Sequence, residues 1–211
     1  MTRAGETTRD VILLHGLWMG PWCMRPLASK LRDQGFSCSR WRYPSMQSLT
    51  MAARGLADEV RRRGPVHLVG HSLGGLLIQQ MLTLPDAPFS QVARVVMLGT
   101  PVAGSKAAAR TRRMAIGRRI LGANVERLCR GVEKSRHSVP MGMIAGGRGL
   151  GLGRVVLPGV RGDGTVAVEE TYWSRLDDHC VMPVTHSSML WSRAVAQQTA
   201  EFLRQGRFRH D

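Results

Sequence analysis

The sequence predicts an α/β fold with a mostly parallel sheet and helices on both of its faces. Short continuous apolar runs, which are typical of strands buried on both sides, alternate with amphipathic helical patterns along most of the chain. One apolar run leads through Gly70-His71-Ser72-Leu73-Gly74 directly into an apolar helical pattern. Because 211 residues suit one well-buried domain and are few for two, we expect a single domain over residues 1–211.

Several stretches are predicted to be strands, and helical patterns fill most of the intervals between them. In chain order the expected strands are residues 11–14, 36–41, 66–69, 92–98, 139–145 and 177–184. Proline suits the first position of a helix and glycine its end. The expected helices are one opened by Pro21 and closed by Gly35, residues 49–63 before Gly64-Pro65, the segment after Ser72 up to Leu84-Pro85, and residues 188–205.

The pentapeptide around Ser72 is the expected centre of the chemistry. A serine at the tip of a strand-to-helix turn is held in a strained backbone conformation, and side chains two residues to either side would collide. Gly70 and Gly74 remove that collision, so the Ser72 hydroxyl can meet both a base and a substrate carbonyl. A serine hydroxyl needs such a base to become a nucleophile, and the base needs a carboxylate that fixes its tautomer.

His186 and Asp163 are the predicted base and acid. In this arrangement the acid and then the histidine follow the serine, on loops at the carboxyl ends of later strands. His186 follows the last expected strand, and Asp163 lies in a tight loop between two glycines. Asp177 and Asp178 are the alternative acids, less favoured because they lie at the base of the last strand and not at a carboxyl end.

The oxyanion that forms in acyl transfer needs preorganised donors, for which we expect the backbone N–H groups of Leu17 and Leu73. Leu73 begins the helix after the serine, and Leu17 lies in the loop after the first strand. Trp18, Met19 and Trp22 in the same region are the candidate substrate-binding residues. Core packing of the first helix would account for these three side chains equally well.

The net charge is +15, and most of the basic residues are arginine. A solvated surface in an arginine-biased proteome would explain this charge, and so would attraction to an anionic partner. Residues 104–139 hold ten basic side chains against Glu126 and Glu133, a net charge of +8. We interpret this stretch as a basic, cap-like insertion over the sheet. It favours peripheral contact with an anionic membrane, and no specific nucleic acid is predicted.

Composition excludes several other classes of protein. The four cysteines are scattered without metal-ligand spacing, so no metal site is expected, and reduced thiols are favoured, with one disulfide left open. No apolar run is long enough to span a bilayer, and the polar residues 1–10 do not form a signal peptide. We expect a cytoplasmic protein, unless a signal was removed before residue 1. The glycines of residues 147–153 lack a following helix and a G-K-[ST] motif, so they predict a flexible link and not a phosphate loop.

Four of these motifs together resemble the signature set of the α/β-hydrolase superfamily. They are His15-Gly16-Leu17, Gly70-His71-Ser72-Leu73-Gly74-Gly75, Gly162-Asp163-Gly164-Thr165-Val166 and Thr185-His186-Ser187. Within the superfamily the chain is similar to small bacterial lipases and esterases and to the GPI inositol deacylases. The first expected strand, residues 11–14, leads directly into His15. The resemblance therefore implies a minimal sheet of about six strands, without the two leading strands that larger members have.

The resemblance also implies ester hydrolysis through an acyl-enzyme, with no cofactor or metal. We therefore expect a serine carboxylester hydrolase for a small-molecule or lipid ester, with Ser72 as nucleophile, His186 as base and Asp163 as the orienting acid. An acyltransferase or thioesterase with the same triad is the first alternative, because water and other acceptors compete for one acyl-enzyme. A non-catalytic binding protein for anionic lipid or nucleic acid, on a hydrolase scaffold, is the second.

Overall fold

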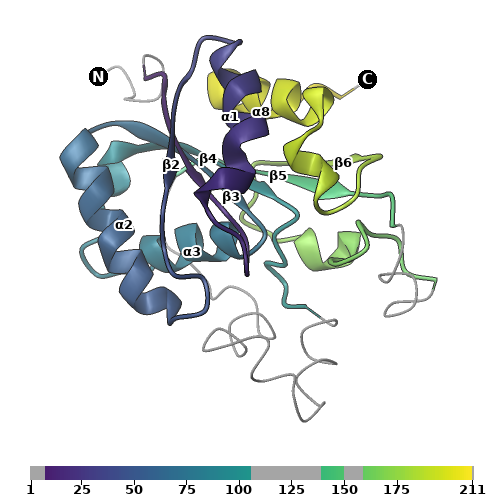
Figure 1. Cartoon of the computed structure of the whole chain (residues 1–211), viewed down its shortest axis with the longest axis horizontal. Helices are drawn as coiled ribbons and strands as arrows, with labels where there is room; N and C mark the ends of the chain where they lie inside the picture. Colours follow the sequence, from purple (N-terminus) through teal and green to yellow (C-terminus); the bar gives the residue numbers. More distant parts are fainter. Residues whose placement is uncertain (1–7, 106–138, 150–158, 211) are drawn as a thin grey trace.

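The computed structural model describes residues 8–105, 139–149 and 159–210 (Figure 1). Its strands form one six-stranded sheet in the order β2-β1-β3-β4-β5-β6, and every neighbouring pair is parallel. The predicted fold class is therefore confirmed. The strands are β1 (Asp10–Leu14), β2 (Ser37–Trp41), β3 (Val66–His71), β4 (Val92–Leu98), β5 (Met141–Gly146) and β6 (Asp178–Met182).

Helices cover both faces of this sheet. Figure 1 shows α1 beside α8 on one face, and α2 with α3 on the other. The α-helices are α1 (Arg25–Arg32), α2 (Leu49–Arg63), α3 (Leu73–Leu82) and α8 (Arg193–Gln205). Short 3-10 helices are η1 (Pro21–Met24), η2 (Phe89–Gln91), η4 (Val168–Thr171) and η5 (Ser188–Leu190).

Two apolar layers hold the helices to the sheet. Ile12 and Leu14 of β1 belong to the layer under α2 and α3, whereas Val11 and Leu13 belong to the layer under α1 and α8. Successive strand side chains point to opposite faces, so a strand buried on both sides is apolar at most of its positions. Full burial of each such side chain contributes about 1.5–3 kcal/mol to the stability of the fold. This gain is the reason that continuous apolar runs in the sequence predict buried strands.

The helices differ from the prediction mainly at their starts. Pro21 opens only the 3-10 helix η1, and α1 begins at Arg25. The closing helix begins at Arg193 and not at residue 188, because the Ser192 side chain caps it by accepting a hydrogen bond from the Val195 N–H at 3.2 Å.

The carboxyl ends of the strands meet at one edge of the sheet. The chain passes from β1 to β2 on one side and then to β3 on the other, so the direction of strand order reverses between β1 and β3. Ligands of open parallel sheets bind at such a switch point. The loops after β1, β3, β4, β5 and β6 are therefore the place to look for a site.

Some predictions lie outside the described residues. Apart from residues 104, 105 and 139, the basic stretch is not among them, so its role as a cap over the sheet stays a prediction. Within the ranges that the structure does describe, none of the helices has the length and apolar character of a membrane span.

Candidate active site

Ser72 lies at the turn from β3 to α3 in a conformation that side chains rarely adopt, with φ 54° and ψ −117°. Two neighbours hold it there. The Ser72 N–H donates to the carbonyl oxygen of Leu98, at the end of β4, at 2.8 Å, and the Thr100 hydroxyl donates to the Ser72 carbonyl oxygen at 3.0 Å. Strain that is held in this way often marks a functional position. The half-buried Ser72 side chain can be reached from solvent.

Glycines allow the close approach of the chain around this serine. A Cβ on Gly70 would lie 2.5 Å from the backbone nitrogen of Gly75, and one on Gly74 would lie 2.6 Å from the carbonyl oxygen of Leu14. A Cβ on Gly75 would lie 2.1 Å from Oγ1 of Thr100. The first two positions follow from the G-x-S-x-G spacing, whereas the need for Gly75 becomes visible only in the packing against the loop after β4.

The structure brings Asp163 and His186 into direct contact. His186 Nδ1 lies 2.6 Å from Asp163 Oδ2, and the His186 N–H donates to the Asp163 carbonyl oxygen at 2.9 Å. The Asp163 side chain is only 1% exposed, and that of His186 is 14% exposed. Because a carboxylate oxygen is an acceptor, Nδ1 carries the proton and Nε2 of the neutral ring is left as the acceptor. This is the tautomer that a general base requires.

The loop after β5 fixes the Asp163 carboxylate. Its Oδ1 accepts the N–H groups of Thr165 at 2.8 Å and Val166 at 2.7 Å, which leaves Oδ2 for the histidine. A Cβ on Gly146 would lie 2.6 Å from the Asp163 Cβ, so the end of β5 passes directly against the acid. The side chain therefore has one well-supported orientation.

The alternative acids have other partners. Asp177 Oδ2 accepts the N–H of Met141 at 2.7 Å, at the start of β5. Asp178 accepts the N–H of Phe208 at 2.7 Å and lies 2.8 Å from His210 Nε2, so it ties the C-terminal segment to β6. Both carboxylates therefore accept backbone N–H groups at the amino-terminal edge of the sheet, away from His186.

His71 is a contact of His186 that the sequence pattern did not reveal. It is fully buried, its Nε2 lies 3.0 Å from the His186 carbonyl oxygen, and the two rings are 4.7 Å apart between centroids. Burial lowers the pKa of His71 to about 3, so the ring is neutral. A carbonyl oxygen can only accept, hence Nε2 carries the proton and donates.

Gly99 is a second unpredicted part of the site. It follows β4 with φ 55°, and a Cβ there would lie 2.9 Å from Asp163 Oδ2 and 3.1 Å from His186 Nδ1. The backbone after β4 thus packs directly against the contact between Asp163 and His186. The Gly-Thr-Pro sequence after residues 92–98 predicts a turn, but no neighbouring residue in the sequence indicates that Asp163 and His186 pack against it.

The loop after β1 packs closely against Ser72. A Cβ on Gly16 would lie 3.3 Å from the Ser72 Cβ. Leu17 follows it, and Leu73 is the first residue of α3. Both residues lie near Ser72, and the role of their N–H groups as oxyanion donors stays a prediction.

Met19 and Trp22 line an apolar groove of about 310 Å³, together with Leu190 and Trp191. Ser187, the residue after His186, also lines it, so the groove runs past the loop that carries the histidine. Met19 packs partly against the layer under α1 and α8. Trp18 and Trp22 are largely exposed, so core packing does not account for them.

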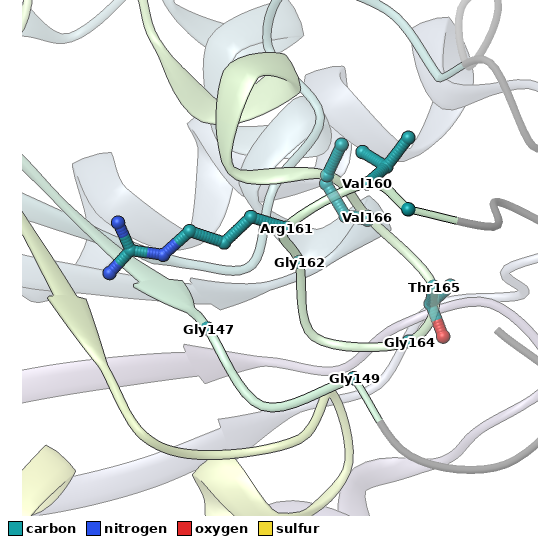
Figure 2. Close-up of a pocket in the computed structure, with 10 residues that line it drawn as sticks. Gly147, Gly149, Val160, Arg161, Gly162, Gly164, Thr165 and Val166 are labelled. Atoms are coloured by element: carbon teal, nitrogen blue, oxygen red, sulfur yellow. The ribbon is translucent and has the colours of Figure 1, made fainter. Parts of the chain in front are cut away.

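A second cavity, of about 320 Å³, lies between residues 147–149 and 159–167. Figure 2 shows these two glycine-rich segments side by side. The Gly147 N–H donates to the Met182 carbonyl oxygen at 2.8 Å, which continues the pairing of β5 with β6. This end of the predicted flexible link is therefore anchored to the sheet, and residues 150–158 lie outside the described residues.

No metal centre is present among the residues that the structure describes, where no group of three or more His, Cys, Asp or Glu side chains could hold an ion. Cys23, Cys38 and Cys180 are free thiols, and Cys129 lies outside the described ranges. Burial raises the pKa of Cys23 and of Cys38 to about 11, so neither is a reactive thiolate at neutral pH.

Comparisons with known proteins agree with this architecture. A family model described as "Alpha/beta hydrolase family" matches residues 11–203. The mature form of a Bacillus licheniformis lipase is 21% identical with a TM-score of 0.78, and the match covers 94% of this chain and 92% of that one. A pyrethroid hydrolase from Sphingobium faniae is 17% identical with a TM-score of 0.66, covering 94% and 98%. Tomato methylketone synthase I, complexed with 2-tridecanone, is 14% identical with a TM-score of 0.61, covering 93% and 96%. At these identities the likeness shows the fold. No curated protein matches the sequence.

Proposed function

The chain belongs to the alpha/beta hydrolase family, and we propose that within it the chain is a serine carboxylester hydrolase that forms an acyl-enzyme on Ser72. The observation that carries the proposal is the 2.6 Å contact between His186 Nδ1 and Asp163 Oδ2, which His71 joins to the turn that holds Ser72 at φ 54°. The names of two structural neighbours, a lipase and a pyrethroid hydrolase, are in keeping with ester substrates.

The proposed reaction assigns a role to each of these groups. The Ser72 Oγ attacks the ester carbonyl carbon while His186 Nε2 takes the hydroxyl proton. Asp163 stabilises the imidazolium, and the N–H groups of Leu17 and Leu73 receive the oxyanion. His186 then gives the proton to the leaving alcohol. In the second half of the reaction His186 Nε2 takes a proton from a water molecule that attacks the acyl carbon. The bond to Ser72 Oγ then breaks, Oγ receives the proton and the carboxylic acid leaves, without a cofactor or metal.

The substrate is proposed to be a small-molecule or lipid ester whose apolar part contacts Trp18, Met19 and Trp22. Support comes from the apolar groove, which borders the residue after His186. Contact of the basic stretch 104–139 with an anionic membrane belongs to the same proposal, and its support is the net charge of +8 alone.

The proposal is tested with a fluorophosphonate label and a panel of p-nitrophenyl esters of increasing acyl length. We expect covalent labelling at Ser72, and a loss of hydrolysis on the order of 10⁶ in Ser72→Ala, because the three residues act as a unit. Full activity in the folded variant would rule out the mechanism. Faster turnover of thioesters, or transfer to an added alcohol in preference to water, would assign the first alternative. A folded wild-type protein that neither labels nor turns over any ester would assign a binding role.

A further inference from the structure

Three of the five tryptophans lie on the surface of the molecule. Trp18 is 62% exposed, Trp22 64% and Trp191 67%. Trp22 and Trp191 come from segments far apart in the chain, yet both line the groove beside Ser187. Trp18 lies four residues before Trp22, in the loop that leads into η1. Large aromatic side chains gathered on a surface mark a place where a partner binds.

Trp18, in the loop after β1, and Trp22, in η1, are held in place and not loosely exposed. Trp18 has φ 58°, in the region that glycine normally occupies, and its N–H donates to Ser45 Oγ at 3.2 Å. A Cβ on Gly20 would lie 3.0 Å from Cδ1 and Nε1 of Trp22, so this indole lies directly over the Gly20 backbone. A strained residue that keeps its large apolar side chain in water indicates a function for that exposure.

The lining of the groove carries positive charge. Arg25 lines it and is exposed, and it is the charged side chain among the described lining residues. The two segments that carry the tryptophans, residues 11–32 and 179–200, contain no aspartate or glutamate. Arg193, the first residue of α8, adds an exposed positive charge two residues after Trp191. The partner that complements this surface is apolar and anionic.

We propose that Trp18, Trp22, Trp191 and Arg25, the tryptophan surface, dock on an anionic lipid membrane. Indole rings favour the membrane–water interface, where the apolar body lies among acyl chains and the N–H reaches the headgroups. Arginine at the same level pairs with lipid phosphates. Docking in this orientation turns the groove beside His186 toward the lipid. This docking does not depend on the proposed hydrolase activity, since it is measured without an ester.

The test uses the full chain and vesicles of phosphatidylcholine with or without phosphatidylglycerol. We expect binding to the anionic vesicles, and quenching of tryptophan emission when the lipid is brominated. Trp41 and Trp173 pack against the layer under α2 and α3, and they provide the unquenched reference. Trp22→Ala and Trp191→Ala should each weaken vesicle binding about tenfold, and the double variant about a hundredfold. Arg25→Gln should reduce the effect of added salt on binding.

Tyr172→Ala is the matched control, because Tyr172 is a 55% exposed aromatic side chain outside the groove. Its vesicle binding should equal that of the wild type. All variants replace exposed side chains, so thermal unfolding should confirm that they stay folded. Equal binding by the wild type and the tryptophan double variant would overturn the proposal. A lipid-free dimer that the double variant converts to a monomer would instead show that this surface pairs two copies of the chain.

Discussion

His71 donates a hydrogen bond from Nε2 to the backbone carbonyl oxygen of His186, at 3.0 Å, and so ties the serine turn to the loop of the proposed base. His186 is thereby held on three sides. Its Nδ1 and its N–H both donate to Asp163, and its carbonyl oxygen accepts from His71. Since His71 is the residue directly before Ser72, this hydrogen bond links the backbone of the proposed base to the turn of the proposed nucleophile.

Replacement of His71 tests this coupling. His71→Phe keeps an aromatic ring but removes the donor, and we expect kcat to fall by about ten- to a hundredfold while KM changes little, because His186 loses part of its support. His71→Gln places an amide N–H near the position of Nε2 and should recover most of the rate. If Gln and Phe were equally impaired, His71 would act through packing and not through its hydrogen bond.

The acid is tested by carboxamide substitutions at three positions. Asp163→Asn should lower kcat on the order of 10⁴, since an amide favours the wrong tautomer of the histidine. Asp177→Asn and Asp178→Asn should lower stability and leave kcat within about tenfold, because both carboxylates accept backbone N–H groups at the opposite edge of the sheet. A reversed pattern of rates would assign the acid to one of those two residues.

Gly99→Ala should damage the reaction more than the fold. Its Cβ would meet Asp163 Oδ2 at 2.9 Å, so the acid and histidine must separate, and we expect kcat to fall at least about tenfold. Gly64→Ala is the matched control, because Gly64 has φ 85° and nothing within 4 Å of the added Cβ. Both variants place a β-carbon at a residue with positive φ, which strains the backbone. Equal kcat losses in the two would remove Gly99 from the site.

Acid should destabilise the protein through its buried histidines. Burial lowers the pKa of His67 to about 4 and that of His71 to about 3, from an ordinary value of 6.5. The unfolded chain therefore binds more protons below pH 6.5, and the unfolding free energy should fall as the pH falls from there. Each histidine contributes a slope of at most about 1.4 kcal/mol per pH unit.

Urea unfolding between pH 4.5 and 7.5 measures this slope. His67→Gln should flatten it by the contribution of one histidine, since glutamine does not titrate. An unchanged slope in this variant would show that folding does not lower the pKa of His67.

Local patterns were sufficient for the architecture. Residues 92–98 were predicted as a strand from a continuous apolar run and form β4 with the same bounds, and residues 49–63 form α2 as expected before Gly64-Pro65. Periodicity and turn residues are properties of neighbouring positions, so they are visible without the fold. The strained turn at Ser72 was visible for the same reason, since both of its glycines lie within the pentapeptide.

Only the tertiary structure decided how the side chains meet. Asp163 and His186 are 23 residues apart, and His71 and His186 are 115 apart, and their contacts exist because parallel strands bring their carboxyl ends to one edge. The close packing of Gly99 against Asp163 and His186 depends on three loops that converge at this point. Whether Trp18 and Trp22 face the core or the solvent also could not be predicted, because an apolar residue in a loop has no periodicity that assigns it to a face.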